Sequence, residues 1–229
     1  MIDTTLAEAL TKILFVIVII TAAYIISTRN LLSLVSVYAL QSLTLVGIAL
    51  CLFLRDGNPV LLAIAIITFG SKVLVIPYFI ATIQEKIRIK RDLEFHYLNP
   101  TSTLLLSMAL MLVVYIALQH VIPPTSTPPL FFFGAVIGIS LMLMGMMVTF
   151  SRKRAITKVM GFLSMENGVL IFGMFVTELP FIIEFLIIID LIILVLLTTI
   201  LTVGIDSTLE DYHDRLNRFH LLDDTEETP

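Results

Sequence analysis

The sequence predicts an all-α, polytopic membrane protein with about seven transmembrane helices. Hydrophobic residues make up 58% of the 229 residues and charged residues 14%, and the mean hydropathy is +1.03. Soluble domains carry roughly 25% charged residues, so this composition is typical of an integral membrane protein. Apolar segments of roughly 20 residues, the length that crosses a bilayer, recur along the chain and leave no room for a sizeable soluble domain.

Charged and turn-forming residues separate the apolar segments. The turn at residues 55–59 closes the second segment, and a proline-rich connector at residues 123–129 precedes the fifth. We expect Pro77 to kink the third segment, because proline removes a helical hydrogen bond. The transmembrane domain is predicted at residues 1–204, followed by a charged tail at residues 205–229. The predicted spans are residues 13–27, 31–54, 60–83, 101–119, 130–150, 154–177 and 180–203.

The orientation follows from the positions of lysine and arginine. If the spans alternate in direction, one side of the membrane receives Arg29, the basic clusters at residues 86–91 and 152–154, and the arginines of the tail. The other side receives Lys12 and Arg55. We therefore expect an outer N-terminus and a cytoplasmic C-terminus in the inner (plasma) membrane of a prokaryotic cell.

The first three and the last three spans share a pattern. Arg29-Asn30 precedes the second span, which carries Gln41-Ser42 near its middle. Arg154-Ala155 opens the sixth span, which carries Glu166-Asn167 at a matching distance. This pattern predicts a 3+1+3 parallel repeat in which the fourth span is the linker.

Ionisable side chains interrupt the apolar spans. A charge near the centre of a transmembrane helix costs about 2.5–3.5 kcal/mol on insertion scales, so each is expected to have a partner or a function. Counting along the helices places Lys72, Glu166 and Asp190 roughly 15–18 Å deep, near the midplane of a ~30 Å hydrocarbon core. Glu184 lies nearer the outer side, and Lys158 lies just inside the cytoplasmic face, where it can snorkel.

These positions predict a proton path that runs from Glu184 through the midplane group to Lys158, with water bridging the gaps. Burial favours the neutral forms of carboxylates and amines, and a nearby opposite charge favours their charged forms. A change in the pairing of Lys72 would therefore move a proton. The alternative is that buried ion pairs lock the helices together. The supporting polar candidates, which either extend the path or bond across helices, are Asn167, Gln41 and Ser42.

Small residues on the fifth and sixth spans predict close helix packing. Gly134 and Gly138 form a small-xxx-small pair, which allows two helix backbones to approach. We expect Gly161 and Gly168 to serve packing in the same way.

No motif for catalysis, nucleotide binding or metal binding is present. The sequence has no phosphate loop, dinucleotide fingerprint or nucleophile elbow. Its single cysteine, Cys51, cannot ligate an iron–sulfur cluster, and its histidines lie in predicted loops or the tail. We therefore expect no catalytic residue, metal ligand or redox centre in this chain, and no nucleic-acid partner.

Several motifs of the chain resemble hydrogenase-4 component E, a membrane subunit of group 4 nickel–iron (NiFe) hydrogenases of the formate hydrogenlyase type. The resemblance covers about residues 29–201, and the C-terminal half also resembles the K-type subunit of respiratory complex I. Glu166 would match one buried glutamate of that subunit, and Glu184 or Asp190 would stand in for the other. The motifs are Tyr38-Ala39-Leu40-Gln41-Ser42-Leu43, Ile67-Thr68-Phe69-Gly70-Ser71-Lys72-Val73-Leu74 through Pro77, Arg154 through Gly161, Met165-Glu166-Asn167-Gly168, and Glu184 with Asp190.

The resemblance implies a non-redox membrane-arm subunit that contributes to proton or sodium translocation. Its partners would be antiporter-like and quinone-site-like membrane subunits and the lipid bilayer. The NiFe centre and the iron–sulfur clusters would lie in partner subunits, so the chain would belong to an oxidoreductase without performing its redox step. Two alternatives remain open at this point: a small solute transporter built on a parallel repeat, and a structural scaffold subunit.

Overall fold

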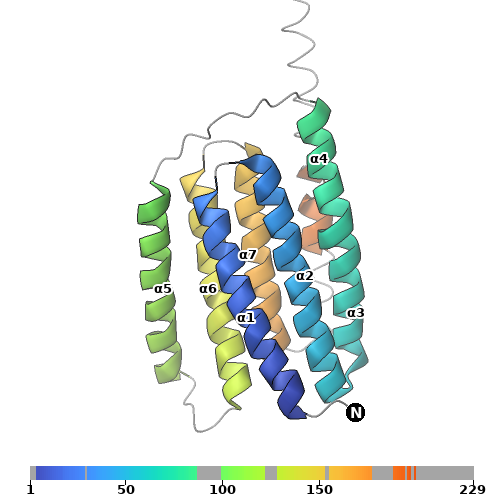
Figure 1. Ribbon diagram of the computed structural model, residues 1–229, viewed down its shortest axis with the longest axis vertical. Coiled ribbons are helices and arrows are strands. Elements are labelled where there is room, and N and C mark those ends of the chain that lie inside the picture. The colour runs from blue at the N-terminus through green and yellow to red at the C-terminus, as the bar shows by residue number, and fades with distance from the viewer. Residues whose placement is uncertain are drawn as a thin grey trace, which may run out of the picture.

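The computed structural model describes residues 4–28, 30–86, 99–121, 128–152, 155–176, 188–193, 195–196 and 199. Within these residues every secondary-structure element is a helix (Figure 1). The elements are α1 (Thr4–Ser27), α2 (Leu31–Asp56), α3 (Pro59–Thr68), the π-helix η1 (Phe69–Val75), α4 (Ile76–Lys86), α5 (Pro100–Val121), α6 (Pro129–Ser151) and α7 (Ala155–Val176).

Among the described residues, six helices are long and apolar enough to cross a bilayer. They are α1, α2, the continuous unit formed by α3, η1 and α4, and then α5, α6 and α7. The predicted all-α class is thereby confirmed for the described residues, and the six helices support a multi-pass membrane protein. The predicted seventh span falls largely outside the described residues. Within that span, residues 188–193 are described and are helical. The count of seven, the parallel repeat and the orientation stay predictions.

A tight turn joins α2 to α3. Gly57 adopts a left-handed conformation with φ 68°, which glycine reaches at little cost, and its N–H donates to the Phe53 carbonyl at 2.8 Å. The Asn58 side chain then accepts from the backbone N–H of Val60 at 3.0 Å and caps α3, while Pro59 fills the first helical position. Glycine just after a helix and proline at its first position are usual at helix ends. The short turn lets α2 and α3 run antiparallel and side by side (Figure 1).

The third span departs from α-helical geometry before Pro77. Residues Phe69–Val75 form a π-helix with Lys72 at its centre, and Pro77 lies two residues after it, in the first turn of α4. The irregular segment thus ends beside the proline, and the expected kink at Pro77 stays a prediction. Short π-helical segments are frequent at functional sites.

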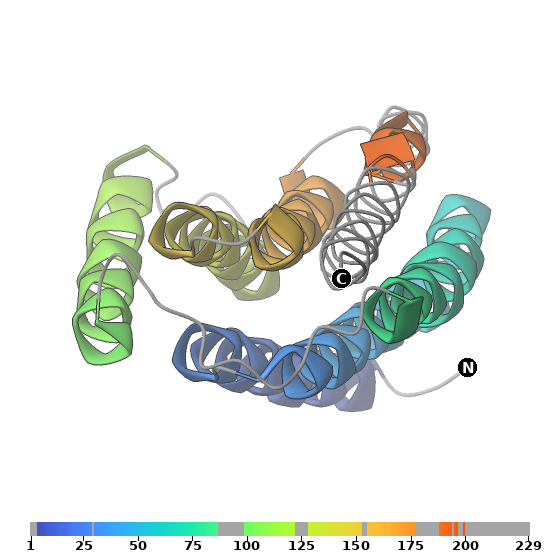
Figure 2. The same ribbon diagram turned by 90° about the horizontal axis from the view of Figure 1, so that it is seen from above.

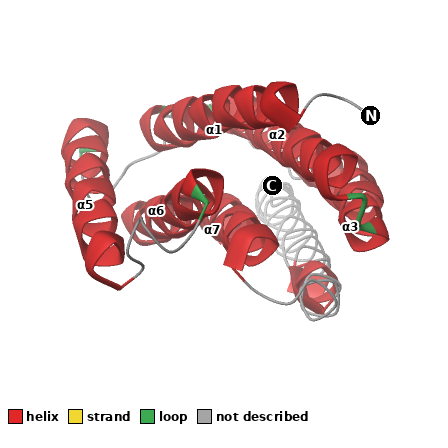
Figure 3. Ribbon diagram, turned by 90° about the horizontal axis from the view of Figure 1, so that it is seen from below, coloured by secondary structure: helices red, strands yellow, loops and turns green. Residues whose placement is uncertain are grey.

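The helices form two facing rows (Figure 2). One row holds α1, α2 and the α3–α4 unit; the other holds α6, α7 and residues 188–193, and α5 stands beside α6. Figure 3 shows the same arrangement from the opposite side. Buried apolar side chains fill the space between the rows, among them Leu45 and Ile48 of α2, Leu141 of α6, and Leu163 and Ile171 of α7.

Helices α6 and α7 approach each other through glycines. A Cβ added at Gly145 would lie 2.6 Å from the Met165 Cα, and one added at Gly168 would lie 2.8 Å from the Met142 Cα. Carbon atoms do not approach so closely without moving a backbone. The expectation that Gly134, Gly138, Gly161 and Gly168 serve helix packing is confirmed, because an added Cβ at each would meet α6 or α7 atoms.

Arg152 connects the end of α6 to the end of α1. Its side chain is only 1% exposed, and Nη2 donates to the carbonyl oxygens of Ile25 at 2.8 Å and Thr28 at 2.7 Å. The last carbonyls of a helix lack partners within it, and a cationic donor satisfies them. Arg152, grouped above with the loop charges of the cytoplasmic side, is therefore a buried cap of α1.

We predict that Gly168→Ala destabilises the protein by roughly 1–3 kcal/mol, because the added methyl group forces α6 and α7 apart. Reversible unfolding in detergent, followed by circular dichroism, measures the change. Gly70→Ala is the matched control, since nothing lies within 4 Å of a Cβ at Gly70. Equal stability of the two variants would show that the α6–α7 interface does not require glycine.

Candidate functional site

A polar cluster lies buried between the two rows of helices. The Nζ atom of Lys72 is 2.8 Å from Oε1 of Glu166 and 4.0 Å from Oδ1 of Asp190. The side chains of Lys72, Glu166 and Asp190 are 0%, 3% and 12% exposed. The structure therefore brings together the three residues that counting along the helices places near one depth.

Amide and hydroxyl groups hold the cluster on its α2 side. Lys72 Nζ donates to Oδ1 of Asn167 at 3.3 Å. Asn167 Nδ2 in turn donates to Oε1 of Gln41 and to Oγ of Ser42, each at 3.2 Å. The Ser164 hydroxyl donates to the same Gln41 oxygen at 3.1 Å. The Asn167 oxygen thus accepts from the lysine, and the Asn167 nitrogen donates to side chains of α2. These bonds fix the Asn167 side chain between the two rows of helices.

The local sequence explains why these side chains converge. Ser164 and Asn167 are three residues apart, so they share one face of α7, and that face meets Gln41 and Ser42 of α2. Lys72 projects from the π-helical segment of the neighbouring helix. Helices α2 and α7, the π-helix η1 and the helical residues 188–193 therefore each contribute to one site.

Of the remaining predicted path residues, Lys158 does not join this cluster. Lys158 is exposed and lies about two turns before Glu166 on α7, roughly 12 Å along the helix axis. Glu184 lies outside the described residues. Their assignment to a path stays a prediction.

The structure adds Tyr38 and Ser164 to the residues singled out from sequence. Tyr38 is fully buried and interacts electrostatically with both Glu166 and Asp190. It precedes Gln41 and Ser42 by three and four residues, so the shared helix face was a signal for it. Ser164 was likewise signalled by its spacing from Asn167.

Several buried polar atoms at the cluster have no hydrogen-bond partner among the described residues. The atoms are Tyr38 OH, Gln41 Nε2, Glu166 Oε2 and both carboxylate oxygens of Asp190. Glu166 Oε1 lies in close ion-pair contact with Lys72 at 2.8 Å, and charge attraction depends little on angle. Thr68 Oγ1 and Ser140 Oγ also lack a hydrogen-bond partner among the described residues, so the ion-pair contacts of Lys72 are what distinguish the cluster.

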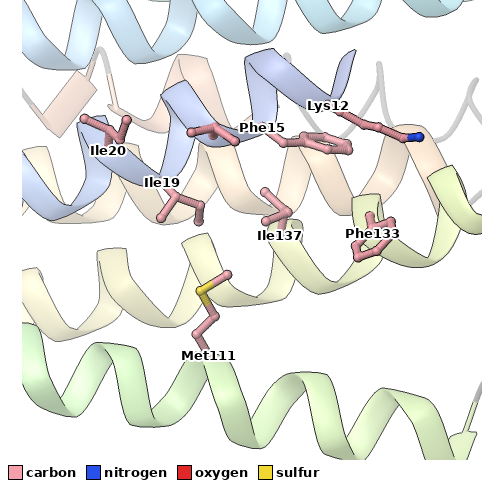
Figure 4. Close-up of a pocket in the computed structure, with 8 residues that line it drawn as sticks. Lys12, Phe15, Ile19, Ile20, Met111, Phe133 and Ile137 are labelled. Atoms are coloured by element: carbon pink, nitrogen blue, oxygen red, sulfur yellow. The ribbon is translucent and has the colours of Figure 1, made fainter. Parts of the chain in front are cut away.

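A separate groove of about 400 Å³ lies between α1, α5 and α6 (Figure 4). Its walls are apolar, with Phe15, Met111 and Phe133 among the lining residues, and Lys12 is its charged member. It shares no residue with the polar cluster. Its lining suits hydrocarbon rather than an ion, so we assign no ion chemistry to it.

We predict that Lys72→Met alone destabilises the protein by about 3–5 kcal/mol, because it leaves buried carboxylates without their counter-ion. Adding Glu166→Gln should recover part of this loss, which gives a coupling energy of roughly 0.5–3 kcal/mol in a double-mutant cycle. Unfolding in detergent measures each free energy. Lys12→Met is the matched control, since Lys12 is exposed. Additive losses would contradict direct pairing of Lys72 and Glu166.

Comparison of the chain with protein-family models, curated proteins and solved structures gives no match. Membership of the hydrogenase-4 component E family stays a prediction that rests on the motifs quoted above. The function proposed below therefore follows from the buried cluster, with the resemblance as its second support.

Proposed function

We propose that this chain carries a proton or sodium ion through the Lys72–Glu166–Asp190 cluster, as a non-redox membrane-arm subunit of a hydrogenase-type complex. The observation that carries the proposal is the buried contact of one ammonium group with two carboxylates. The nickel–iron centre, the iron–sulfur clusters and the energy of electron transfer would belong to partner subunits, as the resemblance implies.

The charge of the cluster supports this proposal. Two carboxylates and one ammonium group leave one negative charge in excess when all are ionised. An uncompensated charge buried in an apolar medium costs many kcal/mol and is normally neutralised. Tyr38 is the titratable neighbour from α2 and is neutral at ordinary pH. The cluster therefore favours the binding of one more monovalent cation.

The unequal distances to Lys72 suggest how the cation would move. Lys72 now pairs closely with Glu166 at 2.8 Å and more distantly with Asp190 at 4.0 Å. The carboxylate that loses the lysine is the one that accepts the cation, since a nearby positive charge favours the ionised form. A small displacement of the lysine on its π-helical segment would exchange the two roles. Glu184 and Lys158 would serve on the outer and cytoplasmic sides of this step.

We predict that Glu166→Gln abolishes ion translocation by the intact complex, because the substituted amide can neither bind a proton nor pair with Lys72 as an anion. The complex is purified through a tag on this chain and reconstituted in liposomes, and internal acidification is followed with a pH-sensitive dye while hydrogen oxidation is measured separately. Electron transfer should continue without translocation.

Glu8→Gln is the matched control, because it neutralises a glutamate on α1 away from the cluster. Full translocation by an assembled Glu166→Gln complex would refute the proposal. Loss of assembly in both Glu166→Gln and Glu166→Asp would instead favour a scaffold subunit. A chain that purifies alone and moves a solute into liposomes would favour the transporter.

A further inference from the structure

The apolar groove between α1, α5 and α6 extends over most of the depth of one membrane leaflet. It runs along α1 from Lys12 to Ile20, which lie toward its opposite ends (Figure 4). Eight residues of helix rise roughly 12 Å, and half of a bilayer's hydrocarbon core is roughly 15 Å thick. The groove volume of about 400 Å³ falls among those of sites that hold small organic ligands. The groove can therefore hold much of one lipid acyl chain.

The attachment of α5 explains why the groove is open. Thr103 Oγ1 of α5 lies 3.4 Å from Ser151 Oγ of α6, and the ring centroids of Tyr115 and Phe132 are 5.8 Å apart. Both contacts hold α5 against α6. Met111, between them in the sequence, is the α5 residue that the structure places at the groove. Only 17% of the α5 span is buried, compared with 72% of the α7 span, so the space between α5 and α1 is left to another molecule of the membrane.

Lys12 gives the groove a positively charged end. It is the charged member of an otherwise apolar lining and is exposed. Within the described part of the chain, no carboxylate lies in ion-pair contact with it. A lysine at the edge of the hydrocarbon core directs its ammonium group toward the lipid headgroups, where it attracts an anionic one. The charge and the apolar walls together match a molecule with an anionic head and a hydrocarbon tail.

We propose that this groove binds one anionic phospholipid, with an acyl chain against Phe15, Ile19 and Met111 and the phosphate beside the Lys12 ammonium group. The chain supplies the van der Waals contacts that the groove walls otherwise lack, and it thereby braces α5 against α1. The groove shares no residue with the Lys72–Glu166–Asp190 cluster. The lipid site therefore does not depend on the proposed ion translocation, and either can fail without the other.

The first test measures lipid binding to the full-length chain by native mass spectrometry from detergent. The probes are phosphatidylglycerol, which is anionic, and phosphatidylcholine, which is zwitterionic, with the same acyl chains. We expect one saturable phosphatidylglycerol site that phosphatidylcholine fills less well. Lys12→Met should weaken phosphatidylglycerol binding roughly fivefold, the factor for one lysine near an anionic surface, and Lys12→Arg should retain it. Equal binding of the two lipids, or unchanged binding in Lys12→Met, would overturn the proposal.

The second test blocks the groove without disturbing the core. Val16 lines the groove and is 58% exposed, so Val16→Trp places an indole in the space proposed for the acyl chain. Ile13→Trp is the matched control, because Ile13 is equally exposed on the same helix and is not part of the lining. We expect Val16→Trp to lose the saturable site, and to lose the rise in melting temperature that phosphatidylglycerol gives the wild-type chain. Ile13→Trp should keep both. Equal lipid binding by the two variants would contradict an acyl chain in this groove.

The third test identifies the occupant in the native membrane. Val16 is replaced by the photoreactive amino acid p-benzoylphenylalanine in the producing cells, and the illuminated membranes are analysed by mass spectrometry. We expect an adduct of phospholipid mass, with a larger anionic share than the adduct formed from the same substitution at Ile13. An adduct with another polypeptide would show that a partner helix fills the groove and would overturn the proposal. The same lipid composition at both positions would overturn it as well.

Discussion

The contact between Lys72 and Glu166 is the interaction on which the polar interior of this protein depends. Both side chains are almost fully buried and lie 2.8 Å apart, in a part of the protein where neither charge has access to bulk water. A lone charge there is costly, so each of the two charges offsets the free-energy cost of burying the other. Asn167, on the facing row of helices, then orients the lysine, and Gln41 and Ser42 of α2 hold the Asn167 side chain in place. Asp190 adds a second carboxylate to the single ammonium group of Lys72, and this excess of acidic groups separates the cluster from a simple structural ion pair.

Two backbone features place this interaction. The glycines of α6 and α7 allow those helices to touch closely, which makes α7 a well-supported element and fixes Glu166 and Asn167. Lys72 sits instead on a π-helical segment, where hydrogen bonding is less regular. The acceptor side of the cluster is thus rigid, and the cationic side lies on the element best suited to a small rearrangement. That asymmetry suits a lysine that exchanges partners more than it suits a fixed clamp.

Much of the site could be predicted because membrane helices have a known rise and burial has a known cost. The 1.5 Å rise per residue placed Lys72, Glu166 and Asp190 at one depth, and the structure then brought them into contact. Depth along a helix does not reveal which helix faces meet. The pairing of Lys72 with Glu166 and of Asn167 with Gln41 could therefore be seen only in the structure. Tyr38 was overlooked because a tyrosine in a helix looks like ordinary core. The burial of Arg152 could not be predicted, because basic residues near a loop are normally solvated, whereas this one caps α1.

The net charge of the cluster decides what it can bind. Glu166 and Asp190 supply two carboxylates, and Lys72 supplies the ammonium group in contact with both. With all three groups ionised, one negative charge is in excess, and burial makes that excess costly. The arrival of one monovalent cation would remove the excess, and a change in the partner of Lys72 would release that cation again. The function proposed above follows from this excess charge.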